Sequence, residues 1–169
     1  MASILMVAGE GLPFIKTGGL ADVIGSLPKA LNERGHEVKV VMPLYKKISD
    51  KYYNELHFDC EYSVSINYHE VPVRVFSKVV DNVCFFFIQH QGYFERDSLY
   101  GYQDDGERFG YFQKAVIEML NQLNYWPNII HCHDWHTGMI PCMVKETHDA
   151  DPRYRAIRFV YPIHNMAYQ

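Results

Sequence analysis

The residue types most suggestive of chemistry lie together in residues 16–23, which read Lys-Thr-Gly-Gly-Leu-Ala-Asp-Val. An apolar run precedes this stretch and a long amphipathic segment follows it, so the pattern predicts a strand, a glycine turn and a helix. At such a junction the first amides of the helix lack partners within it, and the helix dipole favours an anion. Because Lys16 lies in the same turn, the pattern indicates a phosphate site, held by that ammonium and the amides of Gly18 and Gly19.

Two familiar phosphate motifs do not fit this loop. A Walker P-loop ending at Lys16 would need glycine in place of Glu10 and Ile15, and a dinucleotide fingerprint over residues 9–14 would need a small residue in place of Phe14. What remains is a long loop that carries one lysine to the start of a helix. Connections of this kind usually have about 2–6 residues, and longer ones are often functional. An ordinary connection with a solvated lysine is the alternative interpretation.

Three histidines within residues 131–136, which read His-Cys-His-Asp-Trp-His, are the next candidate for chemistry. They could form part of a zinc site, and they come close to the HxHxDH motif of metallo-β-lactamase-like hydrolases. Asp134, however, directly follows the second histidine instead of preceding the third. On a strand, Cys132 would face away from the histidines beside it, and no other cluster completes a coordination shell. We therefore expect no metal and keep a metallohydrolase as an alternative only.

Two more groups of polar residues follow predicted strands. Residues 89–105 form a long polar and aromatic connection that contains Tyr100, and His164-Asn165 comes directly after an apolar run. Ordinary polar loops are the alternative interpretation for both groups. All four groups follow strands, however, and ligands bind to open α/β sheets outside the carboxyl ends of the strands. We therefore expect the four groups to gather on one rim of a sheet.

The elements that must position these residues alternate along the chain. Apolar runs predict parallel strands at residues 4–8, 37–42, 83–88, 127–133 and 158–164. Helical periodicity and length predict helices at residues 20–35, 106–124 and 135–145. The charged and aromatic residues of 45–54 favour a short surface helix, with a loop as the alternative. Two alternating segments, 58–66 and 71–80, predict an inserted antiparallel hairpin. The expected fold is α/β, with a doubly wound and mostly parallel sheet.

Individual residues refine two of the predicted helices. Thr17 directly precedes the first helix and could serve as its N-cap. Pro28 lies inside the amphipathic pattern of that helix, so we expect it to kink the helix and not to end it. Glu107 and Arg108 are expected to begin the helix over residues 106–124 and to hold the loop before it.

Bulk composition limits the class of protein. The 169 residues are 48% hydrophobic and 21% charged, which suits one globular unit with a sizeable core. The 16 basic and 20 acidic residues leave a net charge of -4, so no basic field is expected to hold nucleic acid. No stretch has the pattern of a signal peptide or a membrane span. Four cysteines without CxxC spacing suit a reducing compartment, so we expect a cytoplasmic protein.

Residues 14–23, Phe-Ile-Lys-Thr-Gly-Gly-Leu-Ala-Asp-Val, resemble the N-terminal signature of bacterial glycogen synthases and plant starch synthases. These enzymes are glucosyltransferases that use ADP-glucose. Residues 131–138 resemble the His-Asp-Trp-His segment of the same family, and residues 164–169, His-Asn-Met-Ala-Tyr-Gln, resemble its segment that faces the donor glucose. The resemblance implies transfer of glucose from ADP-glucose to the non-reducing end of an α-1,4-glucan, with retention of anomeric configuration and without a cofactor.

The same resemblance implies a role for each matching residue. His164 would lie near the anomeric centre, and Lys16 with the Gly18 and Gly19 amides would stabilise the departing diphosphate. The other matching residues would bind substrate: Asp22 through a sugar hydroxyl or as a turn cap, Tyr100 at the glucosyl and nucleotide site, Asp134 and His136 on sugar or acceptor, and Asn165 on the donor sugar.

The resemblance finally implies that the chain is a fragment. In the family an N-terminal Rossmann-like domain continues beyond this length, and a second Rossmann-like domain contributes most of the nucleotide-base site and an essential glutamate. Residues 1–169 would then be the truncated N-terminal domain, inactive alone, with the missing C-terminal domain of the same polypeptide as its partner. A non-catalytic sugar- or glucan-binding module is the alternative from another class.

Overall fold

A computed structural model describes residues 1–164, which contain a seven-stranded sheet in the order β3-β4-β5-β2-β1-β6-β7. The strands are β1 (Ser3–Val7), β2 (Glu37–Pro43), β3 (His57–Ile66), β4 (His69–Val80), β5 (Val83–Gln89), β6 (Ile129–Cys132) and β7 (Arg158–Val160). Neighbouring strands from β5 to β7 in this order are parallel. The mostly parallel sheet is therefore confirmed.

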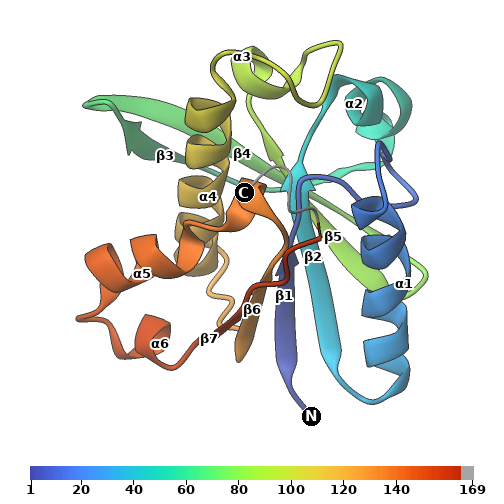
Figure 1. Ribbon diagram of the computed structural model, residues 1–169, viewed down its shortest axis with the longest axis vertical. Helices are drawn as coiled ribbons and strands as arrows, with labels where there is room; N and C mark the ends of the chain where they lie inside the picture. The colour runs from blue at the N-terminus through green and yellow to red at the C-terminus, as the bar shows by residue number, and fades with distance from the viewer. Residues whose placement is uncertain (165–169) are drawn as a thin grey trace.

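Helices cover both faces of the sheet, as a doubly wound fold requires. Figure 1 shows α1 (Leu20–Glu33) on one side of the sheet, and α4 (Asp105–Gln122) with α5 (Ile140–His148) on the other. The shorter elements are α2 (Lys46–Tyr52), η1 (Tyr53–Glu55), α3 (Gln91–Phe94), η2 (Trp135–Thr137) and α6 (Pro152–Arg155). Within residues 1–164, none of these helices has the length and apolar character needed to cross a membrane.

The predicted hairpin forms and extends the sheet beyond β5. β3 pairs with β4, and β4 pairs with β5, both in antiparallel fashion. Asn67 and Tyr68 join the first pair, Asp81 and Asn82 join the second, and all four have positive φ angles. Two-residue hairpin turns need positive φ values because only then does their twist match that of the strands. The sheet's antiparallel part is thus determined by local turn chemistry.

The boundaries of three predicted features differ in the structure. Thr17 is not a helix cap, because Gly19 is the N-cap of α1. No side chain donates or accepts a capping hydrogen bond at this end of α1 within the described residues. The predicted helix over 135–145 is wrong at its start, since a 3-10 turn ends at Thr137 and α5 begins at Ile140, where Pro141 suits the first helical turn. β7 ends at Val160, four residues earlier than expected. As predicted, α1 continues past Pro28.

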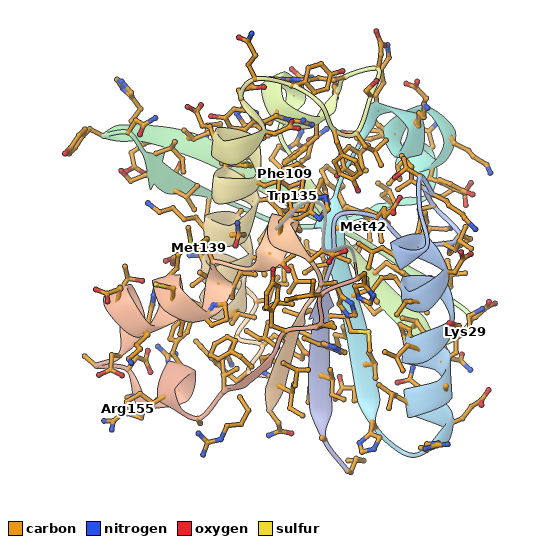
Figure 2. The ribbon with its side chains drawn as sticks, in the orientation of Figure 1. Lys29, Met42, Phe109, Trp135, Met139 and Arg155 are labelled. Atoms are coloured by element: carbon orange, nitrogen blue, oxygen red, sulfur yellow. The ribbon has the colours of Figure 1, made fainter. Side chains whose placement is uncertain are left out.

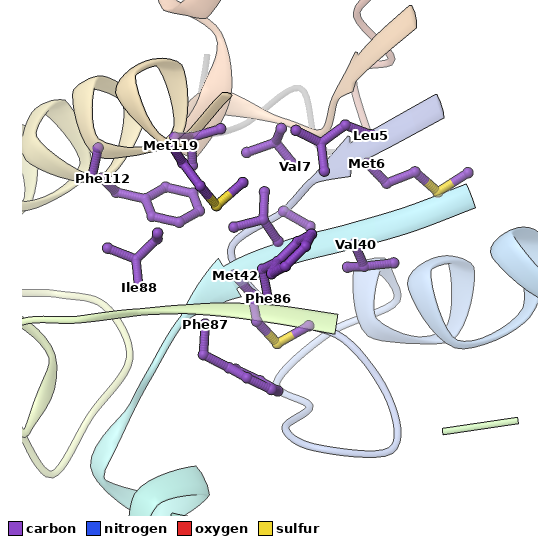
Figure 3. Close-up of a cluster of buried hydrophobic side chains, with 14 of the residues drawn as sticks. Leu5, Met6, Val7, Val40, Met42, Phe86, Phe87, Ile88, Phe112 and Met119 are labelled. Atoms are coloured by element: carbon purple, nitrogen blue, oxygen red, sulfur yellow. The ribbon is translucent and has the colours of Figure 1, made fainter. Parts of the chain in front are cut away.

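The core lies on both faces of the central strands. Figure 3 shows Phe112 of α4 on the side of the sheet to which Ile88 points, whereas Met42 and Phe87 point to the other side. These four side chains are fully buried. Consecutive residues of β5 therefore serve opposite faces, which explains why this strand is continuously apolar and does not alternate.

Candidate functional site

The loops that follow β1, β6 and β7 gather at one rim of the sheet. These three strands are parallel neighbours, so their carboxyl ends lie at the same edge. A cavity of about 710 Å³ opens at this rim, and its wall is formed by Glu10, Thr17, Gly18, Gly19, Leu20, Tyr100, Gly101, Asp134, Trp135, His136 and His164. The structure thus brings together residues from all four groups that the sequence suggested.

Lys16 and Asp22, two of the predicted site residues, are not among the described residues that line this cavity, and they bind each other. The Lys16 Nζ donates to both carboxylate oxygens of Asp22, each at 2.7 Å, and the two side chains are 47% and 54% exposed. Exposed ion pairs of this kind contribute only about 0–1 kcal/mol. The ammonium can therefore leave Asp22 for another anion at little cost.

Glu10 occupies the inner side of the glycine turn. Its side chain is 3% exposed, and its carboxylate accepts hydrogen bonds from the Thr17 amide, from the Thr17 hydroxyl at 2.6 Å and from the Gly18 amide at 3.1 Å. The prediction that both glycine amides are available to a ligand is therefore wrong for Gly18. The Gly18 amide is already bonded within the protein, whereas Gly19 lines the cavity.

Arg108 holds the loop that carries Tyr100. Its fully buried guanidinium donates to the carbonyl oxygens of Tyr93 at 2.7 Å and Leu99 at 3.3 Å, and to the Asp105 carboxylate at 2.5 Å. These contacts agree with the predicted role of Arg108 in holding this loop. Burial raises the pKa of the Tyr100 hydroxyl, and the nearby Glu10 charge raises it further.

His136 is buried in an aromatic wall of the cavity. Its ring centroid lies 4.0 Å from that of Trp135, 4.7 Å from Tyr100 and 4.8 Å from Phe109. Figure 2 shows Phe109 and Trp135 side by side, and their centroids are 4.9 Å apart. Burial lowers the pKa of His136 to about 3, and neither ring nitrogen has a hydrogen-bond partner within residues 1–164. A neutral imidazole can offer one donor and one acceptor to a ligand.

His164 is oriented by two neighbours on the loop after β6. Its Nε2 lies 2.9 Å from the Nδ1 of His133, and the two rings are nearly parallel. Its backbone amide donates to the Asp134 carboxylate at 2.7 Å. Burial, followed by the neighbouring rings of His131 and His164, lowers the pKa of His133 to about 3. His133 therefore enters this contact as a neutral ring at physiological pH.

Asp134 adopts an unusual backbone conformation, with φ of 60° and ψ of -174°. Its carbonyl oxygen accepts hydrogen bonds from the amide and the hydroxyl of Thr137, both at 3.1 Å, which helps to hold this geometry. A non-glycine residue in such a region costs about 1–3 kcal/mol, and such residues concentrate at ligand-binding sites. This backbone conformation places the Asp134 carboxylate where it accepts a hydrogen bond from the His164 amide.

The three histidines of the β6 segment each lie against another aromatic or imidazole ring. Within residues 1–164, no group of three or more His, Cys, Asp or Glu side chains is arranged to hold a metal ion. The rings of His131 and His133 are tilted by 38° to each other with their centroids 4.2 Å apart, and His133 bonds to His164. His131 thus packs against His133, and His133 in turn contacts and orients His164.

Sequence reasoning did not single out Glu10 or Trp135 as site residues, although both line the cavity. The signal for Glu10 was present: a carboxylate stands a few residues before a turn with several amide donors. Its burial and its partners, however, depend on the path of the intervening loop. Asn165 lies outside the described residues.

Comparisons with known proteins give matches over nearly the whole chain. A family model described as the starch synthase catalytic domain matches residues 3–169. The glycogen synthases of Desulforamulus reducens and Clostridium kluyveri are 43% and 45% identical over 166 residues, 98% of this chain. The catalytic domain of starch synthase IV from Arabidopsis thaliana, solved with ADP and acarbose, superimposes with a TM-score of 0.87 at 32% identity over 99% of this chain. The chain spans only 35% of the length of each of these proteins.

Proposed function

The chain belongs to the family of starch synthase catalytic domains, and from that membership we propose that the whole protein transfers glucose from ADP-glucose to the non-reducing end of an α-1,4-glucan. The observation that carries the proposal is the rim cavity, where the glycine turn, Tyr100, His136 and His164 meet. A pocket of this size at the carboxyl edge of a parallel sheet is where such folds bind ligands. The Arabidopsis relative carries ADP in its structure.

The diphosphate is proposed to lie over the first turn of α1. Gly19 and Leu20 line the cavity at the helix N-terminus, where the helix dipole stabilises an anion. Lys16 would exchange Asp22 for the phosphate oxygens and stabilise the charge that develops on the departing ADP. Asp22, once released, can accept a hydrogen bond from a sugar hydroxyl.

The glucosyl group is proposed to lie against the wall made by the loops after β6 and β7. His136 lines the cavity and is proposed to contact the sugar through its ring. Asp134, Tyr100 and Asn165 are further candidates for sugar or nucleotide contacts, and His164 is proposed to lie near the anomeric centre. The family resemblance supports a reaction with retention of configuration, in which acceptor and leaving group share one face of the sugar.

The remainder of the catalytic machinery is proposed to come from a second domain. The relatives are about three times as long as this chain, which supports a larger enzyme of which residues 1–169 are the N-terminal domain. That second domain would supply the base-binding residues and an essential glutamate.

All four cysteines are free thiols, which supports the proposed cytoplasmic location.

The test is glucosyl transfer by the full-length protein, measured as incorporation of labelled glucose from ADP-glucose into glycogen. Lys16→Ala is expected to lower kcat by about 100-fold with an unchanged melting temperature, because it removes charge stabilisation from the transition state. Lys145→Ala, an exposed lysine on α5, is the matched control. Binding of maltooligosaccharides without any transfer would instead identify a glucan-binding module. UDP-glucose in a parallel assay defines the donor.

A further inference from the structure

The Glu10 carboxylate satisfies donors that a phosphate would otherwise take. Successive amides of a glycine turn ahead of a helix form a natural anion site. Here the anion is part of the protein, because Glu10 accepts from the Thr17 amide, the Thr17 hydroxyl and the Gly18 amide. An added Cβ at Gly18 would lie 3.4 Å from Glu10 Oε1, so the turn and the carboxylate are closely packed.

The buried Glu10 carboxylate has hydrogen-bond donors in place of water. A carboxylate that is only 3% exposed loses most of its hydration, and it remains stable only if hydrogen bonds replace the lost water. Hydrogen bonds to an ionised acceptor are about twice as strong as neutral ones. The three bonds therefore tie residues 17–18 to the loop that leaves β1. Lys16 and Gly19 flank this tied pair in the chain, so its position determines where their backbones lie.

We propose that Glu10 is a positioning residue for the donor diphosphate, acting through Thr17 and Gly18 on the flanking Lys16 and Gly19. By occupying the inner amides, Glu10 directs the diphosphate outward, to the Gly19 and Leu20 end of the turn and within reach of Lys16. Its negative charge also disfavours an anion that sits deeper in the cavity. The inference rests on the proposed function, because it concerns the same diphosphate.

The experiment compares Glu10→Ala, Glu10→Asp and Glu10→Gln in the full-length protein. Glu10→Ala is expected to raise the KM for ADP-glucose, and the Kd for ADP in calorimetry, by about tenfold or more, while the KM for glycogen changes less than about twofold. Glu10→Asp keeps the charge but is one methylene shorter, so it should not restore binding. Glu10→Gln keeps one acceptor and should be intermediate. Glu146→Gln, an exposed position on α5, controls for loss of a charge.

Thr17→Val tests the same contact from the other side. It removes the hydroxyl donor and keeps the amide, so the Kd for ADP should rise by about threefold. Combined with Glu10→Gln, its effect should be less than additive, because both changes break the same hydrogen bonds. This pair keeps the test valid if Glu10→Ala does not fold.

Three results would overturn the inference. They are an unchanged Kd for ADP in Glu10→Ala and Glu10→Gln, full restoration by Glu10→Asp, and a rise in both KM values that merely follows the loss of melting temperature. A wild-type protein that binds ADP but transfers no glucose would defeat the proposed function, and the calorimetric series would still decide the role of Glu10.

Discussion

At the scale of single residues, the contact between His133 and His164 shows how a buried side chain can support a reactive one. His133 Nδ1 lies 2.9 Å from His164 Nε2, and its own Nε2 is buried without a hydrogen-bond partner among the described residues. An unpaired acceptor is a smaller penalty than an unpaired N–H. The lower-energy arrangement thus has the proton on Nδ1 of His133, which donates to His164. His164 then carries its own proton on Nδ1.

Replacing His133 tests this arrangement. His133→Asn places an amide close to the position of Nδ1 and should keep most of the activity. His133→Leu has a similar volume but no donor, and leaving His164 without its partner costs about 1–3 kcal/mol, or roughly 5- to 150-fold in kcat. Glucosyl transfer by the full-length variants measures both. Equal activities of the Asn and Leu variants would contradict the proposed hydrogen bond.

At the scale of elements, the loop after β1 and the turn after β6 are packed so tightly that a glycine is required between them. A Cβ at Gly9 would lie 2.8 Å from Cγ of His136, closer than real contacts allow. Gly9→Ala must therefore displace the His136 ring or the loop. An added Cβ at Gly110, within α4, would meet nothing within 4 Å outside the adjacent helix backbone, so Gly110 is the matched control.

The two glycine variants should have opposite effects on the full-length protein. Gly9→Ala is expected to lower the melting temperature and to raise the KM for ADP-glucose, because clashes of this kind cost about 1–3 kcal/mol and shift His136. Gly110→Ala should raise stability by about 0.5–1 kcal/mol and leave KM unchanged, since alanine favours a helix interior. A Gly9→Ala protein with wild-type KM and melting temperature would contradict the tight packing of this loop against His136.

At the scale of the whole molecule, two buried neutral histidines make stability depend on pH. Burial lowers the pKa of both His133 and His136 to about 3, from an ordinary value near 6.5. Between these values the unfolded chain binds more protons than the folded one. Stability is therefore complete above about pH 6.5 and decreases as the pH falls towards 3.

Thermal unfolding of the full-length protein between pH 7.5 and pH 5 measures this loss. Each histidine should contribute about 2 kcal/mol of destabilisation by pH 5, because one unit of pKa difference corresponds to about 1.4 kcal/mol. His136→Phe keeps the aromatic packing and should flatten the pH dependence by about half. If His136→Phe leaves the pH dependence of the melting temperature unchanged, the His136 ring of the wild-type protein must take up a proton in the folded state as it does in the unfolded chain.

The sequence by itself determined the order of the strands along the chain, the hairpin and the helices beside them. These features depend on local properties, namely the 3.6-residue and two-residue apolar periods and the continuous apolar run of β5. It also located the four polar groups at the ends of strands, which was enough to place them on one rim. Family motifs added an expected role for each matching residue.

Only the tertiary structure decided which atoms of those residues are free to bind a ligand. The Glu10 carboxylate accepts a hydrogen bond from the Gly18 amide, and Asp22 forms an ion pair with Lys16. His133, which follows β6, contacts His164, which follows β7. Such contacts depend on loop paths and on the register between parallel strands, to which no local period corresponds. Burial is likewise a property of the assembled fold, and it alone makes His136 a neutral ring with two unpaired nitrogens.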